Sequence, residues 1–211
     1  MSKLPWAKGM ADDRELVPLG QLVKIRGEKN DPIQVTQILS LTADRGVILY
    51  EDKGNIGNSA SDDISRYSIV RKNDLVVNSM NVIIGSVGLS KYEGCLSPVY
   101  FVLCPIDESR IDMRYLAYHF QIRTFQQSLI RIGYGILDHR MRIPWVNLKR
   151  ELFVVPSLEK QREIADALDQ EMVNIDKLVE LRRRQIELDL DYKSALLISK
   201  ITGVEIDGKE K

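Results

Sequence analysis

The chain has 211 residues, a hydrophobic fraction of 44% and a formal net charge of zero. This composition excludes a disordered chain and a protein that binds polyanions over its whole surface, and the length allows one ordinary domain with an appendage. Apolar runs such as Leu75-Val76-Val77 are far shorter than a membrane span, and residues 1–6 lack the apolar core of a signal peptide. We therefore expect a cytoplasmic protein with no membrane partner, in which Cys95 and Cys104 are reduced and buried.

The first part of the chain reads as short strands separated by turn signals. The turn-prone Asp44-Arg45-Gly46 separates the first two strand candidates, and residues 51–59 form a polar loop that contains glycine. The strand candidates, which are rich in β-branched and aromatic residues, are residues 33–41, 47–50, 69–70, 75–77, 82–89 and 99–103.

The apolar period then changes to that of a helix. Residues 112–130 carry apolar side chains at helical spacing, and Asp112 is placed to cap the N-terminus of this helix. A last strand is predicted at residues 152–155. Pro156 ends that strand, and Ser157 is placed to cap the next helix.

The last quarter of the chain is the most informative part. Residues 157–200 contain no proline or glycine, and their apolar residues recur at threes and fours, as in a coiled coil. A helix of this length extends roughly 60 Å, so we expect it to pack its apolar residues against another chain. The run Arg182-Arg183-Arg184 falls where one apolar residue is expected. It could be a polar break that fixes the register between partner helices, a kink in the helix, or a side of the helix that faces solvent. The expected contact residues are Ile164, Leu168, Met172, Ile175, Val179, Ile186 and Leu190.

These elements predict an α+β fold class in three parts. Residues 1–156 form a globular mixed domain, residues 157–200 form one long coiled-coil-forming helix, and residues 201–211 form a flexible tail.

Basic residues are concentrated between Arg110 and Arg150, where only Asp112 and Asp138 oppose them. This local excess is compatible with a surface that faces phosphates. A solvated helix face whose arginines pair with acids elsewhere explains it equally well. The basic residues are Arg110, Arg114, Arg123, Arg131, Arg140, Arg142, Lys149 and Arg150.

The sequence lacks the motifs of common catalytic sites. It has no phosphate-binding loop, no dinucleotide-binding glycine motif and no nucleophile elbow. His119 and His139 have no Cys or His at ligand spacing, so no metal site is expected. Residues 78–81 follow a strand as the catalytic loop of adenine methyltransferases does, but the prolines and the aromatic residue of that loop are missing.

An alternative function from the enzyme class remains open. Asp44, Glu51 and Lys53 imitate the acid and Glu-x-Lys pattern of metal-dependent nucleases, which place carboxylates around Mg²⁺ and a lysine beside the attacking water. On this reading the chain is a small stand-alone DNA nuclease.

Seven segments of the chain form a recognisable series in their order and spacing. They are Val17-Pro18-Leu19-Gly20, residues 73–81, residues 85–90, Ser97-Pro98-Val99-Tyr100, Arg114-Tyr115-Leu116, Gly133-Tyr134-Gly135-Ile136 with Arg140, and residues 154–165. Together they resemble the DNA specificity (S) subunits of type I restriction-modification systems. The resemblance spans nearly the whole chain, but a typical member has two target recognition domains and two conserved helices, whereas this chain has one of each.

The resemblance implies a half-length, non-catalytic bacterial subunit that directs partner subunits to a bipartite site in double-stranded DNA. Adenine methylation, with S-adenosylmethionine as cofactor, would belong to modification subunits and cleavage to restriction subunits, so this chain would hold no cofactor. The long helix would be the spacer and docking element. Three arrangements remain open. Two copies of the chain could form an antiparallel homodimer through that helix, or one copy could serve a modification-subunit dimer as its single reader. The chain could also be a scaffold that mimics the helix and blocks a host enzyme.

DNA recognition requires hydrogen-bonding side chains at base edges and cations at phosphates. Asn78, Ser97 and Tyr100 fit a role in holding the fold better than a role in choosing bases, and Gly133 and Gly135 are expected to permit a left-handed turn. The loop residues suited to base edges are Asn55, Asn58, Asn78, Ser79, Asn81, Tyr92 and Tyr134, and those suited to phosphates are Arg45, Lys53, Lys91, Arg140 and Arg142.

Overall fold

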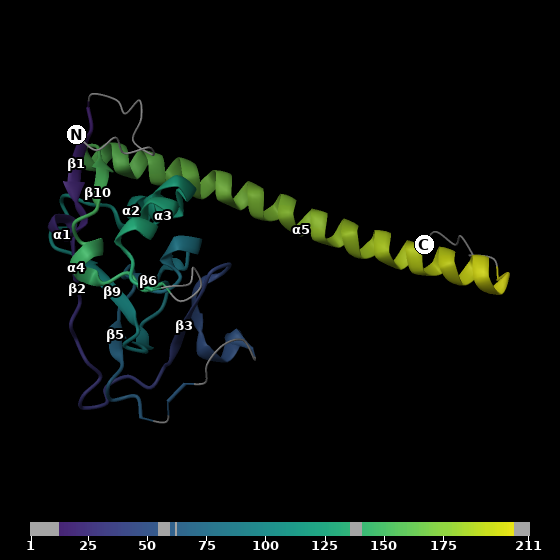
Figure 1. Cartoon of the computed structure of the whole chain (residues 1–211), viewed down its shortest axis with the longest axis horizontal. Helices are drawn as coiled ribbons and strands as arrows, with labels where there is room; N and C mark the ends of the chain where they lie inside the picture. The colour runs from purple at the N-terminus through teal and green to yellow at the C-terminus, as the bar shows by residue number, and fades with distance from the viewer. Residues whose placement is uncertain (1–12, 55–59, 62, 136–140, 205–211) are drawn as a thin grey trace. The chain divides into compact units, whose positions relative to one another are not determined.

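The computed structural model describes residues 13–54, 60–61, 63–135 and 141–204. The chain divides into two compact units, residues 1–165 and 166–211, and is mixed α and β with a long C-terminal helix, as predicted (Figure 1). The predicted tail lies outside the described residues from position 205 onward. In chain order the elements are β1 (Glu15–Pro18), α1 (Leu19–Leu22), β2 (Val23–Ile25), β3 (Leu39–Thr42), β4 (Gly46–Leu49), η2 (Tyr50–Lys53), β5 (Ser68–Val70), β6 (Leu75–Asn78), η3 (Val82–Ile84), β7 (Val87–Leu89), β8 (Gly94–Leu96), β9 (Tyr100–Pro105), α2 (Met113–Gln121), α3 (Arg123–Ser128), η4 (Leu129–Ile132), α4 (Trp145–Leu148), β10 (Leu152–Val155) and α5 (Leu158–Thr202).

The main sheet of the first unit has four antiparallel strands in the order β2-β9-β6-β7. Successive side chains of a strand point to opposite faces of its sheet. In β6, Leu75 and Val77 accordingly enter a larger apolar core, and Val76 enters a smaller one on the other face. Strand β6 is therefore buried on both faces, and the sheet separates the two cores.

The larger core is built from α2, α3, the β1–β10 pair and one face of the sheet. Three fully buried phenylalanines, Phe120, Phe125 and Phe153, have ring centroids 4.9 to 5.6 Å apart. The carboxylate of Asp112 accepts hydrogen bonds from the N–H groups of Arg114 and Tyr115, which confirms the predicted cap of α2. The single helix predicted for residues 112–130 is interrupted, because Ile122 adopts an extended backbone between α2 and α3.

The smaller core lies under the β3–β4 hairpin and the β5–β8 pair. Gly88 of β7 permits the close approach of the hairpin, since a Cβ there would lie 2.9 Å from the Cα of Gly46 and from the backbone nitrogen of Val47. Cys95 and Cys104 are both buried free thiols, as predicted, and burial raises the pKa of each.

Two strand predictions are wrong in part. Residues 33–38 lie outside any strand because buried Asn30 organises them: its side-chain oxygen accepts from the N–H groups of Gln34 and Val35, and its amide donates to the Val35 carbonyl. Residues 82–89 split into η3 and β7, because Gly85 turns the chain with a φ of 83° between them.

The start of α5 belongs to the globular unit. Ser157 Oγ accepts a hydrogen bond from the N–H of Lys160, as the predicted cap requires. Buried Gln161 donates to the carbonyls of Arg110 and Pro156 and accepts from the N–H of Asp112. Ala165 is fully buried in the larger core, so this unit extends beyond the Pro156 boundary expected from the sequence.

Candidate nucleic-acid interface

A turn between β6 and η3 meets a second segment of the chain at one place. The Ser79 carbonyl accepts a 2.9 Å hydrogen bond from the N–H of Ile143. The residue before it, Arg142, forms an antiparallel bridge with Tyr134 through two backbone hydrogen bonds of 2.8 Å. The fold thus brings the turn at Ser79 next to the Tyr134–Arg142 bridge, although these residues are far apart in sequence, and we call residues 78–81, Tyr134 and Arg142 the turn–bridge group.

Side chains of this turn have different roles. Asn78 is buried, and its side-chain oxygen accepts from the N–H of Met80. Ser79 is also buried, and its hydroxyl lies 3.5 Å from the Val99 carbonyl. Both side chains hold the turn, so their geometry favours a structural role over base contact. Met80 is exposed at the tip of the turn and Asn81 is half-buried, so these two remain available to a ligand.

The bridge carries exposed recognition chemistry. Tyr134 is 65% exposed and Arg142 is exposed, which suits an aromatic and a cation that meet a nucleic acid. The predicted contact Arg140 lies outside the described residues. Gly133 has an ordinary φ of −83°, so the predicted left-handed turn is wrong there, whereas Gly135 has a φ of 141°.

A cavity of about 270 Å³ adjoins Tyr134. Arg131 lines it and is paired with the buried carboxylate of Glu151, whereas Arg150 lines it from an exposed position. Arg150 was not among the predicted contacts. The sequence signal that could have indicated Arg150 is the excess of basic residues between Arg110 and Arg150, to which it belongs.

A second group of predicted residues lies on the β3–β4 hairpin, on η2 that follows it and on the turn after β7, and we call it the hairpin group. Arg45 is exposed, and its guanidinium donates to the Asp52 carbonyl. Lys53 Nζ lies 5.1 Å from the centre of the Tyr50 ring. Lys91 is exposed, and half-buried Tyr92 packs against the smaller core. Asn55 and Asn58 lie outside the described residues.

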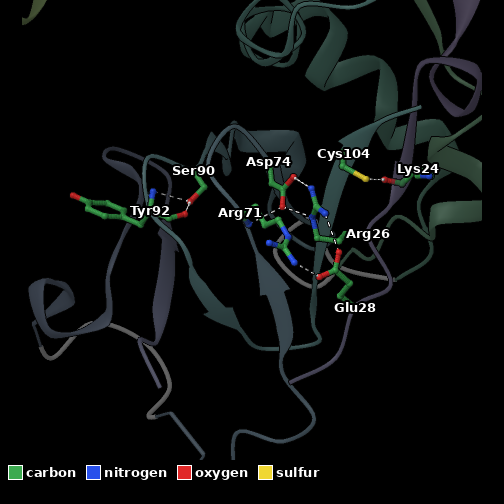
Figure 2. A network of polar contacts seen from close by, with 8 residues as sticks. All are labelled: Lys24, Arg26, Glu28, Arg71, Asp74, Ser90, Tyr92 and Cys104. Carbon is green, nitrogen blue, oxygen red and sulfur yellow. Dashed lines mark hydrogen bonds and ion pairs between the residues drawn. The ribbon is translucent and has the colours of Figure 1, made fainter. Parts of the chain in front are cut away.

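A charged network that the sequence did not reveal fixes the turn between β5 and β6, as Figure 2 shows. The guanidinium of Arg26 donates twice to buried Asp74, over 2.6 Å each, and this pairing raises the pKa of Arg26. Glu28 accepts from Arg71 and Arg26, and these bonds lower the pKa of Glu28.

The same network continues to the hairpin group. The backbone N–H of Ser90 donates to the Asp74 carbonyl, and the Ser90 hydroxyl exchanges hydrogen bonds with the backbone of Tyr92 (Figure 2). The buried ion pair therefore helps to position the turn that carries Lys91 and Tyr92.

The expected contact residues of α5 fall into two classes. Ile164 packs partly against the larger core of the globular unit, so it is at most a partial contact for another chain. Leu168 is half-buried, and the other five are exposed. The exposed five are Met172, Ile175, Val179, Ile186 and Leu190.

The nuclease constellation finds no support among the described residues. Asp44 is exposed in the β3–β4 turn, and Glu51 is exposed in η2. Within the ranges that the structure describes, no three His, Cys, Asp or Glu side chains are grouped to hold a metal ion. No helix of that part of the chain is long and apolar enough to cross a membrane.

Comparisons with solved structures identify the fold. A chain from a structure of complex assembly and conformational transition in the type I R-M system superposes with a TM-score of 0.56, at 18% identity over 88% of this chain and 44% of that one. The HsdS subunit from Thermoanaerobacter tengcongensis gives 0.52, at 19% identity over 80% of this chain and 40% of that one. This chain has the fold of type I specificity subunits.

A third structure agrees. The S subunit of the type I restriction-modification system from M. genitalium gives a TM-score of 0.50, at 18% identity over 81% of this chain and 43% of that one. The chain therefore spans less than half the length of each of these three structures. No protein-family model matches the sequence, and no curated protein matches it significantly.

Proposed function

We propose that the chain is a non-catalytic, sequence-specific DNA recognition subunit of a type I restriction-modification methyltransferase or endonuclease. The observation that carries the proposal is the fold likeness to specificity subunits over 80 to 88% of the chain. The turn–bridge group and the hairpin group supply the aromatic and basic side chains that such a reader needs. Modification subunits, which would bind S-adenosylmethionine, would perform the methylation, and restriction subunits would join where DNA is cleaved.

A direct test maps methylated adenines in a host with and without this chain, each with a modification subunit. We expect an interrupted site that is methylated only when the chain is present. To test the nuclease alternative, the purified chain is incubated with Mg²⁺ and DNA. Cleavage that Glu51→Ala abolishes would replace the proposal with a nuclease.

We further propose that two copies pair through α5 in an antiparallel arrangement. Apolar residues of α5 follow an 11-residue repeat, with Leu168, Val179, Leu190 and Ile201 in one position and Ile164, Ile175, Ile186 and Leu197 in another. Such a repeat keeps apolar residues on one side of an α-helix and favours a slight right-handed twist between partners. We call these eight residues stripe 1.

The spacing of stripe 1 is the same when it is read in either direction. Its members lie at equal distances on both sides of the point between Arg182 and Arg183. An antiparallel second copy centred there places Val179 opposite Ile186, Ile175 opposite Leu190 and Leu168 opposite Leu197. Each layer then joins two apolar side chains.

The charges that border stripe 1 suit the same register. At the centre Arg182 of each copy faces Arg183 of the other copy, where Glu180 and Glu187 of that other copy lie about one turn away. Lys193 falls next to Glu171 of the other copy. Because both signs border the stripe, it is complementary to itself, and a homodimer would recognise a symmetric site.

A further inference from the structure

Residues 78–86, which connect β6 to β7, reverse the usual distribution of polar and apolar side chains. The polar residues Asn78, Ser79 and Ser86 are buried. The two exposed side chains of this loop are apolar, since Met80 is 42% exposed and Ile84 is 64% exposed. Water favours the opposite arrangement, with polar residues at the tip of a turn and apolar residues inside. We call Met80 and Ile84 the apolar tip.

Hydrogen bonds hold this loop in one shape. The N–H of Asn78 donates to the Ser86 carbonyl over 3.0 Å and closes the loop. Inside it, the Asn81 carbonyl accepts from the N–H groups of Ile84 and Ser86, over 3.1 and 3.0 Å. The side-chain oxygen of Asn78 fixes the N–H of Met80 over 3.0 Å. The backbone under the apolar tip is therefore preformed, and binding a ligand there would cost little ordering entropy.

The packing of η3 keeps Ile84 on the surface. Val82 is fully buried in the larger core, and Ile83 packs partly against that core. A 3₁₀-helix has three residues per turn, so the three side chains of η3 point in three directions. A rotation that buried Ile84 would withdraw Val82 from the core. Exposure of Ile84 is therefore built into the fold of this loop.

Exposed cations stand on both sides of the apolar tip. The hydrogen bond from Ile143 to the Ser79 carbonyl places the turn beside Arg142. Helix α3, which packs against η3, begins at Arg123. Both arginines are exposed, and no salt bridge between described residues involves either of them. A base-pair step of a duplex has the complementary order, with apolar stacking faces between two phosphate backbones.

We propose that the apolar tip enters the bound duplex and opens one base-pair step of the recognised site. Met80, with its narrow unbranched side chain, inserts between the bases, and Ile84 packs against the edge of the opened step. The inference rests on the proposed function, because it requires a DNA site. Pyrimidine–purine steps unstack most easily, so the apolar tip would select such a step without a hydrogen bond to its bases.

The test uses the full chain with a modification subunit and duplexes that contain the methylated site. 2-Aminopurine replaces one base at a time, and its fluorescence rises where its stack opens. The methylated adenine is left out, because a methyltransferase turns that base out of the stack by itself. We expect one position whose fluorescence rises with the unmodified chain but not with the double variant Met80→Ala, Ile84→Ala.

Affinity gives a second readout. The double variant should bind the recognised site about tenfold more weakly. It should bind unrelated duplexes within about twofold of the unmodified chain, because non-specific binding depends on phosphate charge. This pattern differs from that of a lost phosphate contact, which weakens binding to all duplexes alike.

Two matched variants serve as controls. Met80→Leu with Ile84→Leu keeps the tip apolar and should retain both the fluorescence rise and the affinity. Ile25→Ala with Ile106→Ala also removes two exposed apolar side chains, and it should change neither readout. It acts at the other end of β9, because Asn78 pairs with the first residue of that strand and Ile106 follows its last.

Three results would overturn the inference. No position shows a fluorescence rise that depends on the apolar tip, or the variant at Ile25 and Ile106 weakens site binding as much as the tip variant, or the tip variant fails to assemble with the modification subunit in the absence of DNA. The last result would assign the apolar tip to a protein contact. A complex that selects a sequence without tip-dependent unstacking refutes this inference and leaves the proposed function standing, whereas a chain that directs no sequence-selective methylation refutes both.

Discussion

Replacing Ile175 with aspartate tests the pairing of α5 most directly. The side chain is 46% exposed in the single chain and would meet Leu190 of a second copy. Burying an isoleucine stabilises by about 1.5 to 3 kcal/mol. The symmetric pair loses two such contacts and must also desolvate two carboxylates. The dimer should therefore weaken by about 4 kcal/mol or more, a rise in Kd of about a thousandfold.

Sedimentation equilibrium measures this change, and circular dichroism checks that the helix and the globular unit remain folded. Asn174→Asp is a matched control, because it introduces the same side chain one residue away and off stripe 1. It should leave the Kd within about threefold. If Ile175→Asp dimerises as tightly as the unmodified chain, stripe 1 is not the contact surface.

The register has its own test. A chain carrying both Val179→Cys and Ile186→Cys should form an intermolecular disulfide under mild oxidation, because these positions face each other about the point between Arg182 and Arg183. Either substitution alone should form little cross-linked dimer. Equal cross-linking by each single variant would instead indicate parallel helices, which place identical residues opposite each other.

Three further results are expected. Burial lowers the pKa of His119 to about 4 from 6.5, so the unfolded chain takes up the proton at a higher pH than the folded chain and stability is lost as the pH falls from 6.5 toward 4. This group should make the free energy of unfolding in urea about 2 kcal/mol lower at pH 5 than at pH 7. His119→Gln should remove that difference. Arg26→Met should destabilise the globular unit by about 3 kcal/mol because it leaves the buried carboxylate of Asp74 without its cation. The double variant Arg26→Met with Asp74→Leu should recover part of that loss. Equal losses of stability in the single and the double variant would refute the coupling between Arg26 and Asp74. Arg142→Ala should weaken binding to all duplexes alike and reduce the salt slope by about one, whereas a loss confined to one sequence would make Arg142 a base reader.

Elements with local signals could be predicted from the sequence. The strand at residues 152–155, the Asp112 cap and the long helix depend on neighbours within a few positions, and the structure has all three. The 33–41 segment could not be predicted in full, because buried Asn30 satisfies backbone groups that a strand would otherwise use. The spacing of threes and fours predicts a coiled-coil seam for α5 in which the run of three arginines takes the place of one apolar residue. Read at elevens, Arg183 shares its position with Met172 and Ser194, so stripe 1 continues past it.

The candidate interface is harder to predict for a physical reason. Asn78 has the chemistry of a base reader, but the fold buries it and uses its side chain to hold Met80. Arg26 and Asp74 are 48 residues apart, and no local pattern announces their pairing. The chemistry of Tyr134 and Arg142 predicts them as contacts, but no local pattern indicates the backbone bridge that joins them.

The buried amide of Gln161 has a consequence for protein engineering. It joins the chain before α2, the end of β10 and the first turn of α5 through three hydrogen bonds, and glutamate could not donate the two that its nitrogen supplies. A chimera that transplants this globular unit onto a foreign helix must therefore keep the native chain through Ala165. A junction at Pro156 would cut through the fold and would be expected to give insoluble product.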